Sequence, residues 1–182
     1  MNLESFVRLS VLCWLCAACA ASPLPPPQPG TLAPDFALKD QYDVEHQLRQ
    51  FRGRDVLLLV CDHNSLSEAE IWLHLLDEQY DEGLEVLPIA DGSGLPFFAK
   101  WFFKGRIKNE LHDPDTPSIL LDWAGDVPES YGMSSVACFV VLIDRDGNVR
   151  FTQSLPTANE TSQQMLLHRI DAYLLPETPH VP

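Results

Sequence analysis

The chain has 182 residues, of which 46% are hydrophobic and 21% are charged, a composition typical of a globular protein. This length accommodates one domain with a sizeable core and a targeting segment. The formal net charge of −14 disfavours nucleic acid as a partner, because binding phosphates requires clustered Lys and Arg. The same charge disfavours adsorption of the domain itself onto a membrane surface.

The N-terminal segment has the organisation of a secretory signal peptide. Arg8 precedes an apolar run over residues 9–18, which is too short to span a bilayer, and small residues follow. We therefore predict that residues 1–21 form a signal peptide and that the protein is exported. Two kinds of processing remain open: simple cleavage after the A-x-A pattern of residues 18–20, or lipidation of Cys19, because residues 16–19 resemble a bacterial lipobox. In a bacterial host the protein would be periplasmic or a membrane-anchored lipoprotein; otherwise it would enter the secretory pathway.

Three further regions follow the signal peptide. Residues 22–32 (SPLPPPQPGTL) form a Pro-rich spacer that cannot pack as a helix or a central strand. Residues 33–176 have the alternating pattern of a folded domain, and residues 177–182 are a short C-terminal tail.

The first half of the domain predicts a strand–helix–strand unit. Short strands are expected at residues 35–38 and 44–48. Residues 56–61 (VLLLVC) form a continuous apolar run that suits a strand buried on both faces. Residues 65–81 have apolar positions near the helical period, and residues 84–90 read as the next parallel strand. Parallel strands joined by a helix form a βαβ unit with a right-handed crossover.

A segment dense in aromatic residues comes next. Residues 95–104 (LPFFAKWFFK) predict a short helix or arm, with Phe97, Trp101 and Phe102 packed inward. The alternative is an exposed aromatic docking surface.

The second half of the domain predicts the remaining strands. They are expected at residues 118–121, 137–144 and 149–152, with a D-G turn over residues 144–148 that joins the last two as a hairpin. An amphipathic helix is expected at residues 161–175. The fold class is therefore α/β, with a mixed central β-sheet flanked by helices.

Several short motifs, in this order, resemble a redoxin domain of the peroxiredoxin-like (alkyl hydroperoxide reductase–thiol-specific antioxidant) group. They are Ala33-Pro34-Asp35-Phe36, Phe51-Arg52-Gly53, the VLLLV strand, and Leu142-Ile143-Asp144-Arg145-Asp146-Gly147. The resemblance covers nearly all of residues 30–176 and implies a thioredoxin-like fold. It also implies a thiol-dependent antioxidant activity, if the catalytic residues are present.

The catalytic residues of that family are missing here. Where the family has a reactive cysteine, this chain has a degenerate loop with Asp62, His63, Ser65 and Glu68. Ser65 lies closest to the cysteine position, and its hydroxyl cannot perform sulfur redox chemistry. A carboxylate such as Glu68 would raise the pKa of a neighbouring thiol. In addition, residues 134–138 contain neither the proline nor the arginine that the two branches of the superfamily place there.

Two cysteines remain in the folded domain. Of five in the chain, Cys61 and Cys138 lie outside the leader. In the implied topology they face each other across an antiparallel strand pair, with Cα atoms about 4.5 Å apart, which permits a disulfide. Three interpretations stay open: a redox-active catalytic pair, a structural disulfide, or two free core thiols. The apolar strand and the adjacent Asp62 both oppose thiolate formation at Cys61.

No cofactor or metal is expected. The six histidines are scattered without ligand spacing, which also argues against a copper-handling role. The leading hypothesis is an exported redoxin-like protein with a degenerate active site, a binding or accessory module for an unknown protein partner in the cell envelope. It would contact the membrane only through a lipid on Cys19. The alternative is an atypical thiol–disulfide oxidoreductase or peroxidase that uses Cys61 and Cys138.

Overall fold

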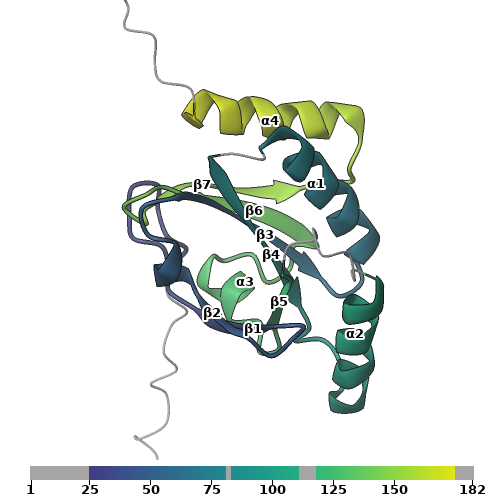
Figure 1. Cartoon of the computed structure of the whole chain (residues 1–182). Coiled ribbons are helices and arrows are strands. Elements are labelled where there is room, and N and C mark those ends of the chain that lie inside the picture. The colour runs from purple at the N-terminus through teal and green to yellow at the C-terminus, as the bar shows by residue number, and fades with distance from the viewer. Residues whose placement is uncertain (1–24, 81–82, 111–117, 175–182) are drawn as a thin grey trace, which may run out of the picture.

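The computed structural model describes residues 25–80, 83–110 and 118–174 (Figure 1). The predicted signal peptide, Cys19, the first residues of the Pro-rich spacer and the C-terminal tail lie outside the described residues, so those assignments stay predictions. None of the described helices combines the length and the apolar character needed to cross a bilayer.

A seven-stranded mixed sheet forms the centre of the domain, in the order β2-β1-β5-β4-β3-β6-β7. β3 runs parallel to β4, and β4 runs parallel to β5, whereas β6, β7, β1 and β2 join by antiparallel pairing. The strands are β1 (Ala37–Asp40), β2 (Glu45–Gln47), β3 (Asp55–Asp62), β4 (Leu84–Asp91), β5 (Leu120–Asp122), β6 (Cys138–Ile143) and β7 (Val149–Leu155).

Helices cover both faces of this sheet. α1 (Leu66–Gln79) and α4 (Glu160–Leu174) lie side by side on one face, and the short α3 (Asp126–Ser130) and a 3-10 helix (Leu48–Phe51) lie on the other (Figure 1). α2 (Phe97–Glu110) packs at the end of the sheet, against residues from β4 and β5.

The alternation of side chains along β3 explains why its whole sequence is apolar. Val56, Leu58 and Val60 point into the core under α3, whereas Leu57, Leu59 and Cys61 point into the core under α1 and α4. Because successive residues of a strand face opposite sides, a strand covered on both sides must be apolar throughout.

The predicted fold class is confirmed, and most element boundaries are shifted by one or two residues. α2 extends six residues and β7 three residues beyond their predicted ends. The D-G hairpin between β6 and β7 is confirmed, and Gly147 adopts the positive φ of 82° that this turn requires. α3 and the 3-10 helix were not predicted, because each is too short to show a helical period. Ser65 is the N-cap residue of α1, but its side chain makes no capping hydrogen bond.

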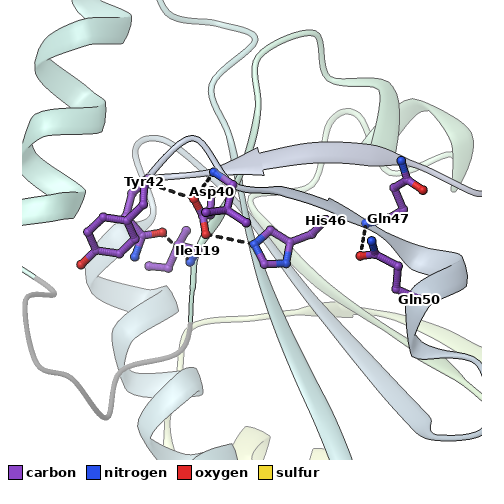
Figure 2. A network of polar contacts seen from close by, with 8 residues as sticks. Asp40, Tyr42, His46, Gln47, Gln50 and Ile119 are labelled. Carbon is purple, nitrogen blue, oxygen red and sulfur yellow. Dashed lines mark hydrogen bonds and ion pairs between the residues drawn. The ribbon is translucent and has the colours of Figure 1, made fainter.

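A buried carboxylate fixes the β1–β2 hairpin (Figure 2). Asp40 Oδ1 accepts hydrogen bonds from the amides of Tyr42 and Val44, at 2.8 and 3.0 Å. His46 Nε2 lies 2.9 Å from Asp40 Oδ2 and, with its proton on Nε2, donates to it. Beside this network, the buried Gln41 side chain accepts from the Ile119 amide at 2.9 Å and so ties the hairpin to the start of β5.

We predict that Asp40→Asn lowers the free energy of unfolding by about 1–3 kcal/mol at neutral pH. The asparagine side chain has a single acceptor oxygen, so it cannot accept from both the backbone amides and His46 as the carboxylate does. Burial raises the pKa of Asp40, but the hydrogen bonds from His46, Val44 and Tyr42 outweigh it and hold the pKa below its ordinary value of 3.8. A lowered folded-state pKa stabilises the protein above the unfolded value, and this contribution is lost as the pH falls through the folded value.

Urea unfolding of the wild type and the variant at neutral and strongly acidic pH checks this prediction. The difference between them should shrink in acid. Asp77→Asn, an exposed carboxylate on α1, is the matched control and should change little. An Asp40→Asn effect that stayed constant with pH would contradict the assignment.

Candidate functional site

The two cysteines form a disulfide between the central strands. Cys61 of β3 is the register partner of Cys138 of β6, and their Cα atoms lie 4.2 Å apart. Each residue is only 3% exposed, and both belong to the core cluster beneath α1 and α4. Of the three interpretations left open by the sequence, two free core thiols is therefore wrong. Both cysteines lie within strands, whereas the resemblance to redoxins places the reactive cysteine around the start of the following helix.

Side chains of α1 and α4 cover the disulfide. Trp72 and Leu76 of α1 and Leu166 and Ile170 of α4 are fully buried in the same cluster as the two cysteines. The Tyr80 hydroxyl, just after α1, donates to Asp171 Oδ1 at 2.7 Å and so joins the two helices. Burial and the neighbouring Asp171 carboxylate raise the pKa of Tyr80 above its ordinary value, so the hydroxyl stays protonated as the donor.

Hydrogen bonds between loop residues and the neighbouring strands hold the loop between β3 and α1. The Asp62 amide donates to the Ala137 carbonyl at 2.8 Å, and Asp62 Oδ1 accepts from the Asn64 amide at 3.0 Å. The His63 amide donates to the Asp91 carbonyl at 3.0 Å. Its ring meets Phe103 edge-on, with centroids 6.5 Å apart. Within residues 25–80, 83–110 and 118–174, no three His, Cys, Asp or Glu side chains converge as a metal site would require.

Glu68 bonds to another element and is not directed at a thiol. Its Oε2 accepts a hydrogen bond from the Ala158 amide at 2.8 Å, in the connection between β7 and α4. The carboxylate that stands near a cysteine position of thioredoxins therefore fastens the approach to α4 onto α1. Asp62, His63, Ser65 and Glu68 are all found at this end of the sheet, and the contacts described for them are those of a folded connection.

A cavity of about 140 Å³ borders the disulfide. Leu59, Cys61 and Ala90 of the sheet form one side, and the other lining residues include Leu66, Ala69, Glu70 and Leu73 of α1 and Arg106 and Ile107 of α2. Most of these side chains are apolar. An apolar cavity of about this size accommodates a molecule no larger than benzene.

The aromatic residues of α2 face outward, which overturns the expectation that they pack into the core. Phe97 is 91% exposed, Phe98 73%, Trp101 75% and Phe102 67%. Phe103 and Ile107 of this helix are buried, as members of the cluster that also contains Ala90 and Leu121. The alternative interpretation, an exposed aromatic surface, is the one that the structure shows.

The lysines of the same helix explain this orientation. Lys100, Lys104 and Lys108 are spaced by four residues and therefore lie in one row. Lys100 Nζ donates to the Trp123 carbonyl at 2.8 Å, Lys104 pairs with Asp43, and Lys108 lies over the Tyr42 ring. The row points toward the rest of the domain, so the aromatic rows must point away from it. The spacing of four is the sequence signal that could have indicated this.

Comparison with known proteins defines the fold class. No protein-family model matches the sequence, and no curated protein sequence matches it significantly. Many solved structures do match, and thioredoxin-like proteins are among them. The fold of this chain is therefore thioredoxin-like.

Three of these structures illustrate the likeness. A protein of Chlorobium tepidum described as thiol:disulfide interchange protein DsbE is 22% identical, with a TM-score of 0.61 over 82% of this chain and 99% of its own. The exposed lipoprotein thioredoxin Etrx1 of Streptococcus pneumoniae is 18% identical, with a TM-score of 0.58 over 75% of this chain and 99% of its own. Thiol peroxidase of Chromobacterium violaceum is 18% identical, with a TM-score of 0.58 over 82% of this chain and 90% of its own. Identities this low establish the fold alone.

We predict that Glu68→Ala lowers the free energy of unfolding by about 1–2 kcal/mol, because the variant leaves the Ala158 amide without its charged acceptor. Chemical denaturation followed by circular dichroism measures this loss. Glu70→Ala, an exposed glutamate on the same helix, is the matched control and should have an effect within about 0.5 kcal/mol. Equal effects of the two substitutions would contradict a structural role for Glu68.

Proposed function

We propose that this protein is a thioredoxin-fold binding or accessory module of the cell envelope whose redox site has degenerated. The observation that carries the proposal is the buried disulfide between Cys61 and Cys138, which joins the two cysteines of the described chain inside the sheet. A protein partner, rather than a thiol substrate, is then the molecule on which the module acts.

The surroundings of the disulfide support a structural role. Thiol–disulfide exchange requires a thiolate to approach one sulfur in line, and both cysteines are 3% exposed. After reduction, the Cys61 thiol would lie in an apolar strand and next to the Asp62 carboxylate. The apolar surroundings and the adjacent negative charge both oppose the thiolate form. Cys61 also lies inside β3, ahead of the N-cap residue Ser65, so the dipole of α1 contributes little to stabilising its charge.

A second candidate function is an atypical thiol–disulfide oxidoreductase. The cavity that borders Cys61 favours it, because about 140 Å³ admits a very small thiol. In that reaction a substrate thiolate attacks Cys61 Sγ, the S–S bond breaks, and Cys138 leaves as a thiolate that takes up a proton. A second substrate thiolate then attacks the mixed disulfide, so the substrate is oxidised to its disulfide and the protein is reduced to the dithiol.

A redox titration distinguishes the two candidates. We predict a reduction potential below about −300 mV for Cys61–Cys138, as for disulfides that resist the glutathione pool, and no insulin-reducing or peroxidase turnover above that of free thiol. Thiol alkylation at defined ratios of reduced to oxidised dithiothreitol provides the measurement. A potential between about −120 and −270 mV, together with turnover abolished by Cys61→Ser, would establish the oxidoreductase and refute the degenerate module.

We predict that the double variant Cys61→Ala/Cys138→Ala loses about 4 kcal/mol of unfolding free energy. The bond closes a loop with a sequence separation of 77 residues, and opening it raises the entropy of the unfolded chain. Urea unfolding of the variant, compared with the dithiothreitol-reduced wild type, gives the value, and the two should agree. A loss below about 1 kcal/mol would show that the disulfide is not needed for stability.

A further inference from the structure

The outer face of α2 is an aromatic surface made of Phe97, Phe98, Trp101 and Phe102. These four side chains are 67–91% exposed. The Trp101 and Phe102 rings meet edge-on with centroids 5.0 Å apart, so the surface is partly pre-arranged. Farther along the helix, no heavy atom lies within 4 Å of the position that a Cβ of Gly105 would occupy. Four large aromatic side chains side by side form an apolar patch of the kind that marks an interaction site.

The inner side of the helix fixes this surface in place. Phe103 and Ile107 are buried, and Lys100 and Lys104 bond to Trp123 and Asp43 of the domain. Rotating α2 to hide its aromatic residues would expose both buried side chains and break both lysine contacts. The outward orientation is therefore an energetically fixed feature of the fold.

The helix is also the basic element of an acidic chain. It carries Lys100, Lys104, Arg106 and Lys108, four of the 12 Lys and Arg residues, whereas the chain has 26 Asp and Glu. With 3.6 residues per turn, the lysine row borders the aromatic rows along one edge, and its last member, Lys108, is exposed there. The net charge of −14 is thus an average that hides a local concentration of positive charge on one helix.

We propose that α2 docks the domain onto an anionic lipid bilayer. Its 14 residues, about 21 Å of helix, would lie in the plane of the membrane interface. The Phe and Trp rings would enter the boundary between headgroups and acyl chains, and the exposed Lys108 would reach lipid phosphates. Exposed aromatic rings together with Lys and Arg on one amphipathic helix are typical of interfacial helices. The acidic remainder of the domain is repelled by the same lipids, which orients the molecule with α2 toward the surface.

This docking site lies apart from the disulfide, so it holds for either candidate function. The proposal differs from the expectation that the membrane is reached only through a lipid on Cys19, which stays a prediction. That expectation used the total charge, whereas binding to a surface depends on the charge and apolar area of the face that meets it.

Vesicle binding by the full chain tests the proposal. The probes are vesicles of phosphatidylglycerol mixed with phosphatidylcholine, and vesicles of phosphatidylcholine alone. We expect the wild type to cosediment with the anionic vesicles, Phe98→Ser/Trp101→Ser to lose at least about ten-fold in partition coefficient, and Lys108→Glu to lose about five-fold or more. Because the N-terminal segment is the same in all variants, differences between them report on α2.

Matched controls separate docking through α2 from nonspecific binding of exposed apolar side chains and from misfolding. Ile71→Ser/Met165→Ser removes two exposed apolar side chains on α1 and α4 and should bind as the wild type does. Binding should also raise and blue-shift tryptophan emission, and Trp101→Phe should abolish that shift while largely keeping the binding. Circular dichroism should be unchanged in every variant, because the substituted side chains are exposed.

Two results would overturn the proposal. One is equal vesicle binding by the wild type, Phe98→Ser/Trp101→Ser and Ile71→Ser/Met165→Ser. The other is absence of vesicle binding by the wild type. If the wild type instead forms a concentration-dependent dimer in sedimentation velocity, and Phe98→Ser/Trp101→Ser abolishes that dimer, the aromatic surface is an interface with a second copy of the chain.

Discussion

The pairing of β3 between β4 and β6 is the constraint on which the rest of the structure depends. β3 is buried on both faces, and its Cys61 is bonded to Cys138 of β6. That register sets which residues face α1 and α4 and which face α3. A slip of one residue would send every side chain of β3 to the opposite core and separate the two sulfurs. Hydrophobic burial and a covalent bond therefore specify the same arrangement.

The end of the sheet where redoxins perform their chemistry is occupied by bonds that hold the fold together. Asp62 joins β3 to the start of β6, and His63 packs between β4 and α2. Glu68 fastens the connection before α4. Each of these residues satisfies a backbone group or fills a contact at a point where the chain changes direction. The loop is therefore stabilised by contacts that do not depend on a cysteine nucleophile.

The hairpin that Asp40 organises also contacts α2. Tyr42 and Asp43 belong to the tight turn that Asp40 organises, and they contact Lys108 and Lys104 of α2. The buried carboxylate thus helps to position a helix that is distant in sequence. A lysine row that faces the protein and aromatic rows that face away are the reverse of an ordinary surface helix, and this reversal is the observation behind the proposed docking surface.

The sequence by itself determined the fold class, the order of most elements, and the facing of Cys61 and Cys138, because apolar runs, turn residues and family motifs are local patterns that the chain carries along its length. Only the tertiary structure decided that the cysteines are bonded, that Glu68 bonds to Ala158 and not to its own helix end, and that the aromatic residues of α2 lie outside. These features depend on partners 77 and 90 residues away, or on which side of a helix the domain occupies. Local periodicity predicts that a helix has distinct faces, and tertiary packing decides which of these faces is buried.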